Sequence, residues 1–162
     1  MHGAAHQAPQ VLQVAVSAPV QDRTLGRVRL QFATRARVVD VPREQRTAPT
    51  GRVWVATPAT TALDLVDDPD RSGGLSNAAT VLAELAADGR LTDDALAEAA
   101  RHFPITTIRR LGRLLDSLDL PALTGGLERL ASEHRRAPIT ALDRRSPPEG
   151  PTDHRWRVAI PP

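Results

Sequence analysis

Alternating apolar and polar positions dominate the first third of the chain. Residues 11–17 and 27–33 both place apolar side chains at every second position. This period of two, with many branched side chains, predicts half-buried β-strands. A short apolar run over 38–41 and a further alternation over 52–56 predict two more strands. Between the first two strands, 18–26 carries Pro, Asp and Gly and is predicted to be a loop.

The apolar period changes to that of a helix after residue 56. Thr57 followed by Pro58 is typical of a helix N-cap and first helical position, and this helix is predicted to run through Val66. Gly89 stands where a glycine usually follows a helix, and Thr92 is a second candidate cap. Stripes of apolar residues predict the further helices, at about 75–88, from Thr92 to Pro104, from Thr106 or Thr107 to Leu118, and at about 123–133.

The C-terminal segment combines prolines with one more alternating pattern. Residues 146–154 are Pro-rich and predicted to be extended, whereas the alternation over 156–160 predicts a last strand that returns to the sheet. We therefore expect an α/β fold of the α+β kind. One mixed sheet should combine the N-terminal strands with this C-terminal strand and pack against four to five central helices. A single domain is expected over 1–162, with a mobile start at about 1–9.

Charge is distributed unevenly along the chain. All 21 basic residues are arginine, which is typical of a GC-rich genome but also of phosphate binding, because a guanidinium offers two donors at once. Residues 22–52 contain eight arginines and three acidic residues, and residues 64–100 contain two arginines and nine acidic residues. From residue 101 onwards there are eleven arginines and seven acidic residues. Net charges of +5, −7 and +4, which sum to +2, predict separate basic and acidic surfaces.

Composition excludes several functional classes. The chain has no cysteine, which excludes thiolate zinc sites, disulfides and thiol nucleophiles. Two Phe and two Trp are too few for a platform that stacks bases. No apolar run approaches the roughly 20 residues of a membrane span, and the start lacks the apolar stretch of a signal peptide. We therefore expect a soluble, cytoplasmic protein with no membrane partner.

The sequence contains no motif typical of an enzyme or a metal site. Residues 68–73 match the first half of an EF-hand loop, but position 12 is Ala79 where calcium needs a bidentate Glu. Asp64 and Asp68 could share a divalent ion, although solvation of a helix end explains them better. Neither HExxH nor GxSxG occurs. We predict no catalytic residue, no metal and no cofactor; the alternative is an enzyme that assembles its site from dispersed carboxylates.

One segment is typical of a DNA-binding helix-turn-helix. Over 95–115, a helix of small residues is followed by a short break and a second helix that carries arginines. The alternative is a plain packed helix pair whose arginines are solvated. The outward-facing candidates for binding nucleic acid or a partner are Thr106, Thr107, Arg109, Arg110 and Arg113 on the helix, and Arg27 and Arg29 on the predicted second strand.

Three stretches resemble one known family of bacterial proteins. They are His2-Gly3 followed by VLQVAVSAP, then VWVATPATTALDLVDDPDRSGG, then FPITTIRRLGRLLDSLDL with the closing DHRWRVAIPP. Their order and spacing are similar to those of the C-terminal domain of the AbiEi antitoxins, from type IV toxin–antitoxin systems first associated with abortive phage infection. The residues that match the family's motifs, with structural roles implied, are Thr57, Pro58, Thr61, Leu63, Asp64, Gly74 and Trp156.

The resemblance implies a function as well as a fold. Members of the family counteract a co-transcribed nucleotidyltransferase-like toxin without a stable complex, and their C-terminal domain is associated with antitoxicity. The preceding winged helix, which represses the operon promoter, has no counterpart in this sequence, so binding to promoter DNA should be weak. Thr60 also departs from the family pattern, which favours a basic residue there. We expect an antitoxin domain that assists operon autoregulation; the alternative is a DNA-binding transcriptional regulator acting through 95–115.

Overall fold

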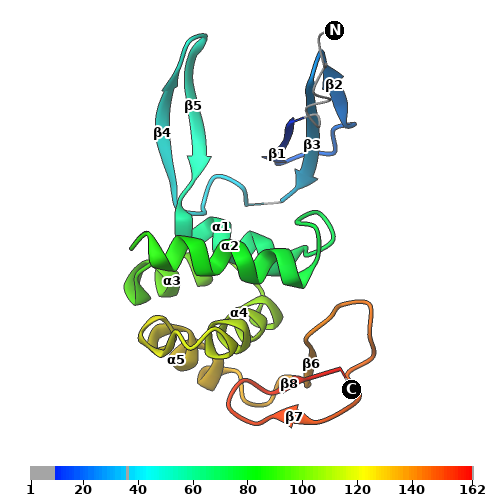
Figure 1. The fold of residues 1–162 in the computed structure, drawn as a ribbon, viewed down its shortest axis with the longest axis vertical. Coiled ribbons are helices and arrows are strands. Elements are labelled where there is room, and N and C mark those ends of the chain that lie inside the picture. The colour runs from blue at the N-terminus through cyan, green and yellow to red at the C-terminus, as the bar shows by residue number, and fades with distance from the viewer. Residues whose placement is uncertain (1–9, 36, 162) are drawn as a thin grey trace, which may run out of the picture. The chain divides into compact units, whose positions relative to one another are not determined.

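Figure 1 shows a computed structural model of the chain, which describes residues 10–35 and 37–161. Contacts between residues divide the chain into two compact units, the first ending at Asp40 and the second beginning at Val41. The start predicted to be mobile, at about 1–9, lies outside the described residues, and the single domain predicted over 1–162 stays a prediction.

The first unit is a three-stranded mixed sheet. Its strands are β1 (Gln10–Val16), β2 (Arg23–Leu25) and β3 (Val28–Thr34), in the order β1-β3-β2. β1 runs parallel to β3, and β2 runs antiparallel to it across a turn in which Gly26 has a positive φ of 59°. The strands predicted over 11–17 and 27–33 are confirmed. The loop predicted over 18–26 contains β2, because three residues are too few to show an alternating pattern.

The second unit begins with an antiparallel hairpin of β4 (Arg43–Ala48) and β5 (Gly51–Ala56). β5 confirms the strand predicted over 52–56. The strand predicted over 38–41 is wrong, because this stretch forms a turn and the apolar side chain of Val41 is buried in the helical core. The sequence of β4, REQRTA, gives no apolar alternation because most of its side chains are exposed or half-buried.

Five α-helices and one short 3₁₀ helix follow. They are α1 (Pro58–Asp67), α2 (Leu75–Ala87), α3 (Asp93–Ala100), α4 (Ile105–Ser117), η1 (Pro121–Leu123) and α5 (Gly125–Glu133). The predicted caps Thr57 and Thr92 are confirmed, since each hydroxyl oxygen accepts a backbone N–H three residues later. Gly89, with a positive φ of 63°, follows α2 as predicted.

Two predicted helix ends are wrong. α3 ends at Ala100 rather than Pro104, and the backbone turns before the proline. The N-cap of α4 is Pro104 rather than Thr106 or Thr107, both of which lie inside the first turn. Proline at this position disfavours helical geometry in the residue before it, so the break falls earlier than the threonines suggested.

The C-terminal segment forms a separate small sheet. Its strands are β6 (Thr140–Ala141), β7 (Thr152–Asp153) and β8 (Val158–Ala159), in the order β6-β8-β7. The α+β class and the C-terminal strand are confirmed. The strand does not join the N-terminal strands as expected: β8 pairs with β6 and β7, and β7 lies within the segment 146–154 that was expected to be extended.

The core of the second unit lies between its helices and extends to the C-terminal sheet. Figure 1 shows β6, β7 and β8 on the opposite side of α4 from α1, and α4 contacts both layers. α4 is therefore covered on two faces. The largest fully buried apolar side chains are Leu63, Val66, Leu82, Leu96, Leu111, Leu115, Leu127, Trp156 and Val158.

Candidate functional site

The arginines of α4 point into the protein. Arg109 is 1% exposed and Arg110 is 7% exposed, so the prediction that both are turned outward is wrong. Arg109 donates to the backbone oxygens of Pro138 at 2.6 Å and His134 at 2.9 Å, and Arg110 donates to that of Ala141 at 2.9 Å. Burial lowers the pKa of both guanidiniums, and carbonyl acceptors offset part of the cost of removing them from water.

The physical reason is the second layer on α4. Its apolar stripe, with Leu111 and Leu115 fully buried, faces the helical core as predicted. The opposite face, which would be solvated in a plain helix pair, is covered by the segment that follows α5. Arg109 and Arg110 therefore fasten this C-terminal segment to the core.

The other predicted side chains of α4 are also engaged. Thr107 is fully buried and donates to the Asp67 carboxylate at 2.5 Å, and Thr106 is half-buried. Arg113 is half-buried and pairs with Asp153 at 3.2 Å between Nε and Oδ2. A helix-turn-helix needs these side chains free at the surface, so this face of α4 does not offer a groove-reading surface.

Trp156 fastens the C-terminal segment at its centre. Its indole is fully buried against the backbone of α4, where Gly112 leaves room for it. A Cβ at Gly112 would come within 2.3 Å of the ring. The indole N–H donates to Asp116 at 2.5 Å, which satisfies its one polar atom.

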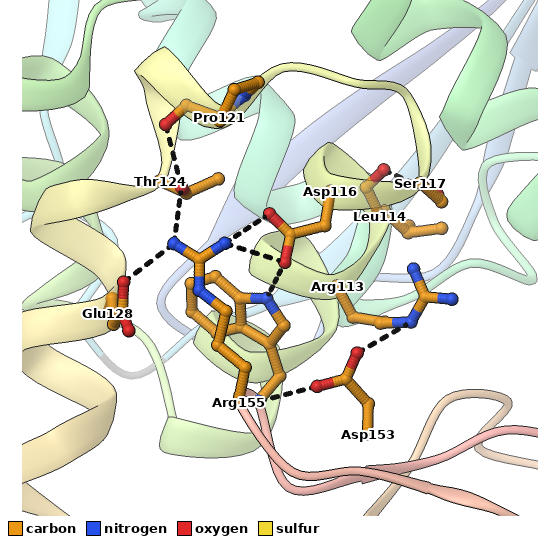
Figure 2. Close-up of polar contacts among 10 residues, drawn as sticks. Arg113, Leu114, Asp116, Ser117, Pro121, Thr124, Glu128, Asp153 and Arg155 are labelled. Atoms are coloured by element: carbon orange, nitrogen blue, oxygen red, sulfur yellow. Dashed lines mark hydrogen bonds and ion pairs between the residues drawn. The ribbon is translucent and has the colours of Figure 1, made fainter.

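Arg155 joins three elements around that tryptophan. Figure 2 shows its guanidinium between the Asp116 carboxylate of α4 and the Glu128 carboxylate of α5. It donates to Asp116 at 2.8 and 3.0 Å, to Glu128 at 2.7 Å and to the Thr124 hydroxyl at 3.1 Å, and it lies 5.1 Å from the Trp156 ring centre. The hydrogen bond between Arg155 and Glu128 raises the pKa of the arginine and lowers that of the glutamate.

The predicted strand arginines lie in the first unit. Arg27 precedes β3 and Arg29 lies within it, and both side chains are exposed. The structure therefore leaves them available for contact, while their role in binding stays a prediction. They do not belong to the same unit as the arginines of α4.

The family-motif residues occupy structural positions. Thr57 and Pro58 start α1, Thr61 donates its backbone N–H to the Thr57 oxygen at 2.8 Å, and Leu63 is fully buried. The backbone oxygen of Asp64 accepts the N–H of Asp68 at the end of the same helix. Gly74 precedes α2 with a positive φ of 94°, and Trp156 is fully buried. Among the described residues, no group of three or more His, Asp or Glu side chains could hold a metal ion.

Sequence reasoning missed one exposed surface, the β4–β5 ribbon over 43–56. Trp54 on this ribbon is 59% exposed, and the Arg43 guanidinium stacks on it with 4.6 Å to the ring centre. Val53 and Val55 are also exposed. The signal in the sequence was an isolated tryptophan among arginines, but the alternation with two valines favoured a buried strand.

The fold defines an α+β protein whose C-terminal segment is fastened to a helical core through arginine and tryptophan side chains. The chain matches the AbiEi antitoxin C-terminal domain over residues 1–117 and belongs to that family. Family membership supports an antitoxin role in a toxin–antitoxin system. No curated protein and no solved structure matches the chain. None of the described helices is long and apolar enough to cross a membrane.

Proposed function

We propose that this protein is the antitoxin of a type IV system and counteracts a co-encoded nucleotidyltransferase-like toxin in the cytoplasm. The observation that carries the proposal is the family match over 1–117, which includes β1 to β5 and extends to the last residue of α4. The antitoxin acts without chemistry of its own and without a stable complex with the toxin.

A growth assay tests the antitoxin role. The toxin gene next to this one is induced in cells that also express the full chain, and growth should resume when the chain is abundant. Cells with an empty vector supply the control. Growth arrest that persists at ample antitoxin level, verified by immunoblot, would remove the proposal.

The absence of a stable complex has its own test. The purified chain and toxin are mixed and passed over a size-exclusion column, and they should elute separately under conditions where growth rescue occurs. Co-elution at equal stoichiometry would replace this part of the proposal with direct sequestration of the toxin.

Arg27 and Arg29 are our candidates for the surface that performs the antitoxin role, because both are exposed on the matched region. Replacing both by glutamine should reduce growth rescue without changing the thermal unfolding of the chain. Arg90→Gln with Arg101→Gln, at two exposed positions on the second unit, removes the same charge as a control. Equal rescue by both double variants would reject this surface.

Operon autoregulation is the second candidate function, and the β4–β5 ribbon favours it. Side chains alternate between the two faces of a strand, so the register places Gln45 opposite Trp54 and Thr47 opposite Arg52 on one face. That face also carries Arg43 and has no acidic residue, whereas Glu44 lies on the other face beside Arg46. A two-stranded ribbon fits the major groove, where arginine and glutamine are common contacts.

The ribbon provides a matched pair of variants for a DNA test. Arg52→Gln removes a cation from the proposed contact face, and Arg46→Gln removes one from the opposite face. In anisotropy titrations with DNA from the operon's upstream region, Arg52→Gln should weaken binding and reduce the salt slope by about one. Arg46→Gln should change both much less. Similar effects of the two variants would indicate general charge attraction rather than this face.

A further inference from the structure

A pocket of about 310 Å³ lies where the C-terminal segment crosses α4 and α5. Its walls include four arginines from three parts of the second unit: Arg109 of α4, Arg135 after α5, and Arg155 and Arg157 before β8. His154 also lines it. Neither the family match nor the proposed antitoxin role assigns any binding to this pocket.

Positive charge in the pocket exceeds the negative charge available to balance it. Glu128 is the one carboxylate among the described lining residues, and Arg155 already binds it at 2.7 Å. Arg155 is balanced further by Asp116. No lining carboxylate then remains for Arg109, Arg135 and Arg157, so the pocket favours an anion.

Arg157, which lines the pocket, combines an unfavourable backbone conformation with an unsatisfied side-chain nitrogen. Its backbone has a φ of 53°, in the left-handed region that residues with a Cβ rarely adopt. Its Nε is buried and has no hydrogen-bond partner in the described part of the chain, while Nη2 reaches only the Ala137 oxygen at 3.4 Å. Unpaired buried donors are uncommon in folded proteins, and strained backbone conformations cluster at functional sites.

Arg109 adds to the same imbalance. Its two terminal nitrogens donate to neutral carbonyl oxygens. These oxygens satisfy the hydrogen-bonding capacity of the two nitrogens, but they carry no full negative charge to balance the guanidinium. After burial, the nearby charge of Arg157 is the second cause that lowers the pKa of Arg109. Two guanidiniums thus repel each other at the edge of the pocket, and a bound anion would attract both and offset that repulsion.

We propose that this pocket binds a phosphate group, either free or at the end of a nucleotide. A phosphate presents several acceptor oxygens and up to two negative charges, which match the unbalanced charge of Arg109, Arg135 and Arg157 better than a single carboxylate does. The pocket has the volume of roughly ten water molecules, so it has space for a phosphate and part of the molecule that carries it.

Calorimetry and thermal unfolding of the full chain test the proposal. The probes are inorganic phosphate, a nucleoside 5′-monophosphate and the same nucleoside without phosphate, at constant ionic strength set with chloride. Wild type should bind both phosphates and unfold at higher temperature with them. Stronger binding of the monophosphate identifies a nucleotide as the source, and equal binding identifies free phosphate. No binding of either, or equal binding of the bare nucleoside, overturns the proposal.

Two neighbouring arginines provide the matched variants. Arg135 lines the pocket and Arg136 does not, and both are exposed, so neither substitution should disturb folding. Arg135→Gln should weaken phosphate binding by about tenfold, as expected for one charge-assisted hydrogen bond, while Arg136→Gln should leave it near the wild-type value. An equal loss in both variants would show that only overall charge matters, which contradicts a pocket.

Arg157→Gln supplies a second, independent readout. It should abolish the phosphate-induced rise in unfolding temperature. The unliganded variant should unfold at the wild-type temperature or above, because the substitution removes a guanidinium that repels Arg109 and whose buried Nε has no partner among the described residues. A variant that keeps the phosphate effect, or that is strongly destabilised without ligand, would assign Arg157 to structure alone and overturn its role in the site.

Discussion

The absence of a side chain at Gly112 decides how the C-terminal segment packs against α4. Alanine in place of a glycine inside a helix usually stabilises it by about 0.5–1 kcal/mol. Here an added Cβ would lie 2.3 to 2.4 Å from three atoms of the Trp156 ring. We therefore predict the opposite sign: Gly112→Ala should lower the free energy of unfolding by about 1–3 kcal/mol, the usual cost of overpacking.

Urea unfolding followed by circular dichroism measures this change. Gly125→Ala is the control, because its Cβ would approach only the Asp93 carboxylate, at 3.3 Å, and no ring atom. It should leave stability nearly unchanged. If Gly112→Ala proved as stable as wild type, the indole would not lie against α4 in solution.

Glu128 gives the protein one expected dependence on pH. The hydrogen bond from Arg155 holds the pKa of this carboxyl below its ordinary value of 4.5. A carboxyl with a lowered pKa in the folded state stabilises the fold above its unfolded pKa, and this contribution is lost as the pH falls through the folded pKa. Glu128→Gln should therefore cost up to about 1 kcal/mol near pH 7, a small value because the pair is partly exposed.

The comparison of Glu128→Gln with wild type should be repeated across the acid range. Their stabilities should begin to converge as the pH falls below 4.5, the ordinary pKa of this carboxyl, and should become equal once the pH lies below the lowered pKa of the folded state, where both side chains are neutral. A constant difference at every pH would mean that the glutamine changes packing and that charge has no part in the effect.

Arg109 and Arg110 show why single residues are hard to place from sequence. The apolar stripe of α4 was predicted correctly, and two arginines off that stripe are normally solvated. Their acceptors are backbone oxygens of Pro138, His134 and Ala141, which lie 25 to 31 residues further along the chain. Backbone oxygens have no residue type, so no pattern in the sequence could reveal that they cover this face.

Elements with local signals were predictable, and those held by distant contacts were not. The caps Thr57 and Thr92 and the glycine at 89 act within a few residues, and all three were predicted correctly. The polar strand β4 owes its structure to pairing with β5, and β8 pairs with β6 and β7 because of a chain path that no local pattern specifies.

The cap of α3 provides a prediction at the level of an element. The Thr92 hydroxyl accepts the Ala95 N–H at 3.2 Å, and Asp93 and Asp94 follow in the positively polarised first turn. Thr92→Ala should lower the free energy of unfolding by about 1 kcal/mol. Thr92→Ser should lower it much less, because serine keeps the capping hydroxyl. Chemical denaturation of the three chains measures the difference. If serine is as destabilising as alanine, the methyl group matters and the cap does not.

The molecule as a whole depends on residues beyond the family match. The matched region ends at residue 117, yet Leu127, Ala131, Trp156 and Val158 belong to the same buried core cluster as the helices α1 to α4. Without them, the apolar stripe of α4 and its two buried arginines would both meet water. The matched region alone therefore lacks one side of its core.

Two truncated chains turn this into a prediction. A chain that ends at Ser117 should lose cooperative unfolding, because it exposes the core that α5 and the C-terminal segment cover. A chain that contains 41–162 should retain it, because every buried residue of the core cluster, from Val41 to Val158, is present. Circular dichroism during thermal and urea unfolding distinguishes the two. Cooperative unfolding of the chain ending at Ser117 would show that the matched region is a complete folding unit. It would contradict the conclusion that the core needs the C-terminal segment held by Trp156 and the arginines of α4.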